Sequence, residues 1–420
     1  MRRHAPLLLI LLLALALRLY QLTAVPPGLT HDEANHAREA IGVLAGDLRF
    51  YFPYNYGSEP VYSYTVAGAM ALLGENLLAL RLVNVFFGVA AIAMSYLWID
   101  RAFDRRTALL AAGLLAVSFW PVASSREALR AGMLPFFMAC AVWFFWQFLE
   151  TPPARSSARR ITAVLLFAVS LAITLHIYLA ARVAWLLFPA FLLYLAWRQR
   201  PLLRRAWLPT LLGLLLTALL TAPMALYLRQ NPQVQPRVSM LDGPLQQLAA
   251  GEFAPLLRNA ADALLAFVWP GFGDQFLAYN VPGRPVLDPL TAILFALGLL
   301  AAITATLQNP KSEIPNLSAL RSSLYTPRAF ALLWFFIGIL PSLITGPTAN
   351  TTRNLAALTP VHLLPAIGFL TLLNWLAPVI RKPLSVARKP LSVARKPLSV
   401  ARKPLSVARK PLSVARKPLS

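Results

Sequence analysis

Apolar stretches of nearly bilayer-spanning length recur along the chain, separated by short polar segments. A transmembrane helix needs about 20 predominantly apolar residues, and several runs here approach that length. The pattern predicts ten spans, which places both ends of the chain on the same side of the membrane. The predicted spans are 5–22, 79–99, 107–121, 129–148, 161–178, 183–197, 207–228, 288–307, 329–345 and 355–379.

Two of the connecting segments are long, 23–78 and 229–287. The first contains an apolar run at 61–74 that is short for a span, and we predict an interfacial helix with Tyr62 and Tyr64 at head-group level. The second contains an amphipathic piece around 244–268. The expected fold class is therefore an all-α polytopic membrane protein with about ten transmembrane helices and interfacial helices on its outer face.

Composition supports this class. The chain is 58% hydrophobic and 13% charged, with a mean hydropathy of +0.60, which is too apolar for a soluble protein of 420 residues. Arg2 and Arg3 begin a signal-like region, but no clear cleavage site follows, so we expect the first helix to be retained. Cys140 is the single cysteine, which excludes an internal disulfide and a thiolate metal cluster.

Charge sets the orientation. With the N-terminus in the cytoplasm, every cytoplasmic loop is rich in arginine or lysine, as the positive-inside rule requires. Twelve of the sixteen acids then lie on the outer face. Either acids fill whatever outer loops exist, or they mark an outward-facing catalytic surface. We expect a multi-pass protein of the cell membrane whose active site is extracytoplasmic.

The segment 381–420 differs from the rest of the chain. It repeats Arg-Lys-Pro-Leu-Ser-Val-Ala and carries twelve of the 39 basic residues and no acid. Proline at every seventh position argues against a continuous helix. We predict a disordered basic tail near anionic lipid head groups, following a membrane domain at 1–380. A tandem duplication at the end of the gene is the alternative, and no nucleic-acid partner is expected.

The segment after the first span carries candidate chemistry. If 31–45 is helical, Asp32, His36 and Glu39 share one face. An acid at the membrane boundary is a candidate general base, although Thr30 or Asp32 could instead cap the helix. The histidines could equally be polar surface. A divalent metal is conceivable here, but the spacing is not typical of a metal site, and no cofactor is predicted.

Arginines on the same predicted face offer a phosphate site. Arg126 and Arg130 are spaced i, i+4, so on a helix two guanidinium groups would face one anion. The alternative is snorkelling to the interface. Arg182 and Arg353 begin later spans on that face. The outer surface could thus hold a lipid phosphate while a carboxylate deprotonates an acceptor.

Several short motifs occur in one order along the chain: Asp32-Glu33, Glu59-Pro60 before a tyrosine-containing helix, Leu80-Arg81-Leu82-Val83-Asn84, Ser125-Arg126-Glu127, and the segment from Asn280 to Pro289. Together they resemble membrane glycosyltransferases of the GT-C fold, especially the dolichyl-phosphate-mannose protein mannosyltransferase and aminoarabinose transferase group. The resemblance covers roughly 1–375, and the first 150 residues carry most of it. Many relatives continue with further spans or an outer soluble domain, which leaves acceptor recognition open.

The resemblance implies transfer of a sugar from a polyprenyl-phosphate donor to an acceptor hydroxyl on a lipid, glycan or protein, with inversion. It implies that Asp32 is the catalytic carboxylate and Glu33 its neighbour. A transporter or lipid flippase is the alternative, but such proteins usually place ionisable groups mid-membrane. The residues expected to bind substrate are Glu59, Tyr62, Arg126, Glu127, Arg130, Arg182 and Arg353.

Overall fold

The computed structural model describes residues 4–151, 157–277, 279–308, 325–346 and 351–386, and its described elements are all helices. The residues divide into two units, 1–375 and 376–420. The longer helices of the described part are α1 (Ala5–Leu19), α4 (Leu77–Ala102), α5 (Arg105–Val117), α7 (Leu134–Glu150), α8 (Ser157–Leu175), α9 (Leu187–Arg198), α10 (Arg200–Gln230), α14 (Pro289–Leu307), α16 (Tyr325–Ile344) and α17 (Leu358–Val386).

Each predicted span coincides with one of these helices. Eight helical stretches are long and apolar enough to cross a membrane, counting the 3-10 turns that lead into α7, α9 and α17. Helix α1 is apolar but shorter. The predicted span 107–121 is divided at Ser118 between α5 and the short α6 (Phe119–Ser124). The polytopic all-α class is confirmed.

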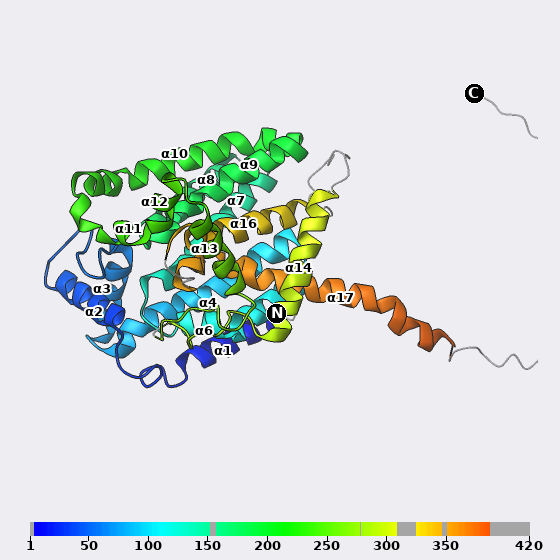
Figure 1. Cartoon of the computed structure of the whole chain (residues 1–420), viewed down its shortest axis with the longest axis horizontal. Coiled ribbons are helices and arrows are strands. Elements are labelled where there is room, and N and C mark those ends of the chain that lie inside the picture. Colours follow the sequence, from blue (N-terminus) through cyan, green and yellow to red (C-terminus); the bar gives the residue numbers. More distant parts are fainter. Residues whose placement is uncertain (1–3, 152–156, 278, 309–324, 347–350, 387–420) are drawn as a thin grey trace, which may run out of the picture. The chain divides into compact units, whose positions relative to one another are not determined.

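Aromatic side chains fill the centre of the first unit. Trp98 of α4 packs against Trp334 of α16, with ring centroids 5.1 Å apart. Phe330 of α16 lies 4.9 Å from Phe191 of α9 and 5.3 Å from Trp146 of α7. Helices α7, α8, α9 and α10 pack beside one another (Figure 1). This rigid interior fixes the helix ends that carry the polar residues.

Small residues allow the closest helix crossing. A Cβ added to Gly298 of α14 would lie 1.8 Å from the carbonyl oxygen of Leu364, and one added to Gly368 of α17 would lie 1.9 Å from that of Leu294. Only glycine permits two backbones to approach this closely, as is common between membrane helices.

The long connecting segments form short helices. The segment 23–78 contains α2 (His31–Leu44) and α3 (Pro60–Leu73), the latter being the apolar helix predicted at 61–74. In 229–287 the predicted amphipathic piece is two helices, because Gly251 adopts φ +88° between them. The helices of this second segment are α11 (Pro236–Leu241), α12 (Gly243–Ala249) and α13 (Ala254–Leu265), after the 3-10 turn η3 (Pro232–Val234).

The second unit is described only from 376 to 386, the last part of α17. The helix extends to Val386, so the first six residues of the predicted disordered tail are helical. The rest of the predicted tail lies outside the described residues.

Candidate active site

Helix α2 begins with a complete capping box. The Thr30 side chain accepts from the backbone N–H of Glu33 at 3.2 Å, and the Glu33 carboxylate accepts from the backbone N–H of Thr30 at 3.1 Å. Of the two predicted caps, Thr30 is therefore the one used, and the carboxylate of Asp32 is left for other contacts. Adjacent helical residues point in different directions, so Asp32 and Glu33 face different surroundings.

Glu33 faces the protein interior. Its two carboxylate oxygens accept from Nε and Nη2 of Arg81 at 2.8 and 2.9 Å, and both side chains are fully buried. Oε1 also accepts from the backbone N–H of Ala128 at 2.9 Å. Arg81 further donates to the carbonyl oxygens of three residues that follow α1. Those residues are Leu22, Pro26 and Gly28. Both oxygens of Glu33 are thus committed to holding α2 against α4.

Arg126 is used in a similar way. It donates to the carbonyl oxygens of four residues at the end of α1 and just beyond it, Leu17, Arg18, Gln21 and Val25. Residues 125–129 are not helical, because α6 ends at Ser124 and the 3-10 turn η1 (Arg130–Met133) begins only at Arg130. The predicted i, i+4 pair is therefore wrong: the two guanidinium groups have separate partners.

Three 3-10 turns at the starts of spanning helices converge at one end of the first unit. They are η1, η2 (Leu179–Leu186) and η4 (Thr351–Ala357), and η4 contacts both others. Short 3-10 stretches at helix ends expose backbone and side chains that a regular helix would direct elsewhere. Together with the start of α2, they surround a cavity of about 20 Å³, which is room for about one water molecule.

Asp32 lines this cavity. So do Leu129, Arg130, Ala131, Thr352, His36, Asn55, Tyr178, Arg237 and Tyr279. The Asp32 side chain is 21% exposed, and its Oδ2 accepts a hydrogen bond from the hydroxyl of Tyr279. Asn55 donates to the Asp32 carbonyl oxygen at 3.5 Å. The predicted base therefore lies among two arginines, two tyrosines and a histidine.

Arg130 is oriented by a carboxylate and an aromatic ring. Its Nη1 lies 3.3 Å from Glu59 Oε2 and donates to the carbonyl oxygen of Gly57 at 2.8 Å, while its guanidinium lies 5.4 Å from the ring centroid of Tyr178. Glu59 is fully buried and also lies 3.5 Å from Arg182, which donates to Gln235 at 2.9 Å. Glu59 thus neutralises part of the positive charge around the cavity.

Arg237 differs from the other arginines of the site. Among the residues that the structure describes, it makes no hydrogen bond and no ion pair, although it lines the cavity with Asp32. Its side chain is half-buried at the start of α11. The charges of Asp32 and Glu59 attract it without a direct ion pair, so its hydrogen-bond donors remain available for an anionic ligand.

His36 forms a second polar connection into the cavity. Its Nδ1 lies 2.9 Å from Glu39 Oε2, and that oxygen also accepts from Ser63 Oγ at 2.5 Å. His36 Nε2 lies 3.5 Å from the amide nitrogen of Asn55. The buried Tyr62 packs edge-on against the imidazole with ring centroids 4.9 Å apart. The predicted shared face of α2 is confirmed, and Glu39 fixes the ring so that Nε2 points toward the cavity.

Burial changes the proton affinity of two groups near this cavity. The pKa of Glu127 is raised to about 8 by desolvation and by the neighbouring carboxylate of Glu33. The pKa of the Tyr279 hydroxyl is raised well above its usual value by burial and by the charge of Asp32. Tyr279 is therefore a hydrogen-bond donor at neutral pH, and Glu127 is partly protonated.

The remaining predicted substrate residues lie outside the cavity lining. Glu127 is buried, and Arg353 donates to Thr345 Oγ1 and to the Gly346 carbonyl at 3.2 and 3.1 Å. The sequence reasoning missed five polar residues of the cavity, Asn55, Tyr178, Arg237, Tyr279 and Thr352. Asn55 has a φ of +55°, a feature invisible in the sequence, and Arg237 and Tyr279 belong to 229–287, where no spacing pointed to them.

No three histidine, cysteine, aspartate or glutamate side chains gather around a potential metal position in the described ranges. Two other carboxylates of this region already have partners: Glu33 has Arg81, and Glu59 has Arg130 and Arg182. A requirement for a divalent metal stays a prediction.

Known proteins resemble this chain in sequence and in fold. The sequence model of the dolichyl-phosphate-mannose-protein mannosyltransferase family matches residues 50–233. No curated protein sequence matches the chain.

The oligosaccharyltransferase of Archaeoglobus fulgidus, in its apo form, superposes with a TM-score of 0.60 at 16% identity over 92% of this chain and 52% of that chain. The same enzyme in complex with an inhibitory peptide and a dolichol-phosphate superposes with a TM-score of 0.56 at 16% identity, over 94% of this chain and 52% of that chain. ArnT from Cupriavidus metallidurans, bound to undecaprenyl phosphate, superposes with a TM-score of 0.47 at 18% identity, over 90% of this chain and 81% of that chain.

These similarities define the fold. The chain has the GT-C fold of membrane glycosyltransferases, and it spans about half the length of the archaeal oligosaccharyltransferase that it matches. Within that fold it resembles the dolichyl-phosphate-mannose-protein mannosyltransferases, in a segment that contains Glu59, Tyr62, Arg126, Arg130 and Arg182.

Proposed function

We propose that this protein transfers a sugar from a polyprenyl-phosphate donor to a hydroxyl group of a lipid, glycan or protein acceptor. The observation that carries the proposal is the grouping of the Asp32 carboxylate with Arg130 and Arg237 in one cavity at the helix ends. A carboxylate and two cations side by side supply the base and the phosphate site that this reaction needs. The matched family model and the GT-C fold support the same reaction class.

In the proposed reaction, Asp32 accepts the proton of the acceptor hydroxyl. The acceptor oxygen forms a bond to the anomeric carbon while the bond from that carbon to the phosphate oxygen breaks, and its electron pair leaves with the polyprenyl phosphate. Direct displacement inverts the anomeric centre. General base catalysis of this kind contributes typically 10²–10⁴-fold.

Arg237 and Arg130 stabilise the negative charge that develops on the leaving phosphate. Arg237 makes no direct ion pair or hydrogen bond among the described residues, whereas Arg130 is held in place by Glu59 and by the carbonyl oxygen of Gly57. The hydroxyl of Tyr279 donates to Oδ2 of Asp32 and orients the carboxylate, which leaves Oδ1 to accept the proton of the acceptor hydroxyl. His36, fixed by Glu39, lies beside this pathway.

We place this site on the extracytoplasmic face of the cell membrane. Support comes from the basic loops at the opposite ends of the helices, which by the positive-inside rule stay in the cytoplasm. The cavity is formed at the ends predicted to be outside, where the segments 23–78 and 229–287 meet.

Purified protein in lipid nanodiscs, incubated with a panel of polyprenyl-phosphate sugars and hydroxyl acceptors, provides the test. Mass spectrometry of the products is expected to show transfer by the wild type and a loss of roughly 10²–10⁴-fold for Asp32→Asn. The control is Asp47→Asn, because Asp47 belongs to the same segment but is about half exposed and bonded to Arg49. Wild-type activity in Asp32→Asn would reject the base assignment.

A further inference from the structure

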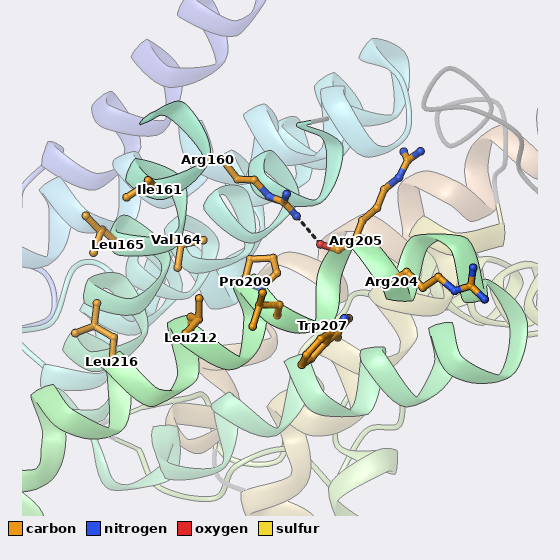
Figure 2. Close-up of a pocket in the computed structure, with 11 residues that line it drawn as sticks. Arg160, Ile161, Val164, Leu165, Arg204, Arg205, Trp207, Pro209, Leu212 and Leu216 are labelled. Atoms are coloured by element: carbon orange, nitrogen blue, oxygen red, sulfur yellow. Dashed lines mark hydrogen bonds between the residues drawn. The ribbon is translucent and has the colours of Figure 1, made fainter. Parts of the chain in front are cut away.

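An apolar groove runs between α8 and α10, away from the candidate active site. Its volume is about 550 Å³, which is in the range of ligand pockets. Figure 2 shows apolar side chains of the two helices along the groove and the arginines gathered at one end. The lining residues are Ile161, Val164, Leu165, Trp207, Leu208, Pro209, Leu212 and Leu216, with Arg160, Arg204 and Arg205.

The two helices are in direct contact along the floor of the groove. A Cβ added to Gly213 of α10 would lie 2.5 Å from the ring of Phe167, so the helices touch at this glycine. Four residues further along, Thr217 Oγ1 donates to the carbonyl oxygen of Ala168 at 3.2 Å. The groove therefore has a closed floor and a lipid-facing opening, with Leu212 half exposed beside Gly213.

The arginine end is built around a proline. Pro209 lies inside α10 and has no N–H, so the carbonyl oxygen of Arg205, four residues earlier, loses its helical partner. Arg160 of α8 supplies the missing donor, with Nη2 at 2.5 Å from that oxygen (Figure 2). Its Nε is buried and has no hydrogen-bond partner among the described residues. One edge of the guanidinium thus anchors the helices, and another is left unpaired.

The surrounding sequence provides no anion for these arginines. No aspartate or glutamate occurs between Glu150 and Asp242, a stretch that includes all of α8, α9 and α10. In the part of the chain that the structure describes, Arg160, Arg204 and Arg205 form no ion pair with an acidic residue. Among the described residues, no carboxylate balances these three charges, which leaves them open to an anion from another molecule.

We propose that this groove binds an anionic diacyl phospholipid, with its phosphate on the arginines and one acyl chain along the apolar walls. Basic pockets between membrane helices on the cytoplasmic side bind such head groups. The site is separate from the proposed donor site. Helix α8 begins at the groove's arginine end, whereas just past its other end the carbonyl oxygen of His176 bonds to the backbone N–H of Val61, at the start of α3.

Native mass spectrometry tests the proposal. Wild-type protein in mixed micelles with dioleoyl-phosphatidylglycerol is expected to retain one such lipid, in preference to dioleoyl-phosphatidylcholine. The double variant Arg204→Ala, Arg205→Ala is expected to bind the anionic lipid roughly 30-fold more weakly, the factor that two basic residues near an anionic head group provide. Arg160 is left intact in this variant, so the anchor of α8 to α10 remains.

Two further variants separate a built site from a basic surface. Arg200→Ala removes an exposed arginine of α10 that does not line the groove, and it is expected to retain the lipid like wild type. Leu212→Trp fills the groove without changing charge and is expected to lose the lipid. Three results would overturn the proposal: equal retention of the two phospholipids, an equal loss in Arg200→Ala and the double variant, or displacement of the lipid by substoichiometric polyprenyl phosphate.

Discussion

Arg237 provides the sharpest test of how donor phosphate is held. Every other arginine that reaches the region around Asp32 already has carbonyl or carboxylate partners, whereas Arg237 has none in the described residues. Replacing Arg237 with alanine removes no hydrogen bond or ion pair among the described residues, but it removes the attraction of this charge to Asp32 and Glu59. The free energy of unfolding should therefore fall by no more than about 1 kcal/mol.

Donor binding should respond very differently. Truncating one partner of a buried charge pair costs about 2–5 kcal/mol, and the half-buried position of Arg237 favours the lower end. We expect Arg237→Ala to weaken donor binding by about 2 kcal/mol, which is roughly 30-fold. Titration of the purified protein with polyprenyl phosphate, followed by calorimetry or native mass spectrometry, measures this change. A melting curve recorded in the same detergent measures the folding effect.

Arg258 supplies the matched control. It lies in the same segment, 229–287, is exposed on α13, and does not line the cavity. Arg258→Ala should bind donor like wild type. The reasoning is refuted if Arg237→Ala binds polyprenyl phosphate with wild-type affinity, or if both variants lose affinity equally, since the second result would mean that only the overall charge of the loop matters.

Three other predictions concern stability and topology. Arg81→Ala should destabilise the fold by about 3–5 kcal/mol, because it leaves the carboxylate of Glu33 buried and unpaired. Thermal unfolding in detergent measures this loss of stability. The pKa of Glu127 is raised to about 8, so its burial favours the protonated form. The wild type should then lose stability as pH rises from about 4.5 toward 8, and the Glu127→Gln variant should show a flatter melting profile over that range. On a cysteine-free background, cysteine at position 240 should react with an impermeant reagent from outside the cell, and cysteine at position 156 should not. The reverse result would mean that the predicted membrane orientation is wrong.

The helices could be predicted because their signal is local. Apolar runs near the length of a bilayer identified every spanning helix, and the i, i+4 spacing placed Asp32 and His36 on one face of α2. These inferences need only the periodicity of one segment. The sequence was also sufficient to locate an acidic segment next to arginines, which is where the cavity forms.

The partners of each arginine could not be predicted in the same way. Arg126 bonds to carbonyl oxygens about 100 residues earlier, and its pairing with Arg130 failed because residues 125–129 are not helical. Arg237 and Tyr279 reach Asp32 from a segment more than 200 residues later. Such contacts depend on how the helices pack, and no spacing within a single segment encodes them.

The buried arginines Arg81 and Arg126 have a common structural role, which accounts for the position of the proposed base, Asp32. The chain leaves α1 at Leu19 and follows an irregular path to Thr30, and the backbone carbonyl groups of this path that are buried against the protein need hydrogen-bond partners. Arg81 and Arg126 donate to the carbonyl oxygens of this path, and Glu33 in turn neutralises Arg81. The start of α2 is thereby fixed on the side opposite the cavity. Asp32, one residue earlier, is then presented to Arg237 without being consumed by the same network. The two acids thus have different surroundings: buried Glu33 holds the helix, and partly exposed Asp32 is the member that we propose as the base.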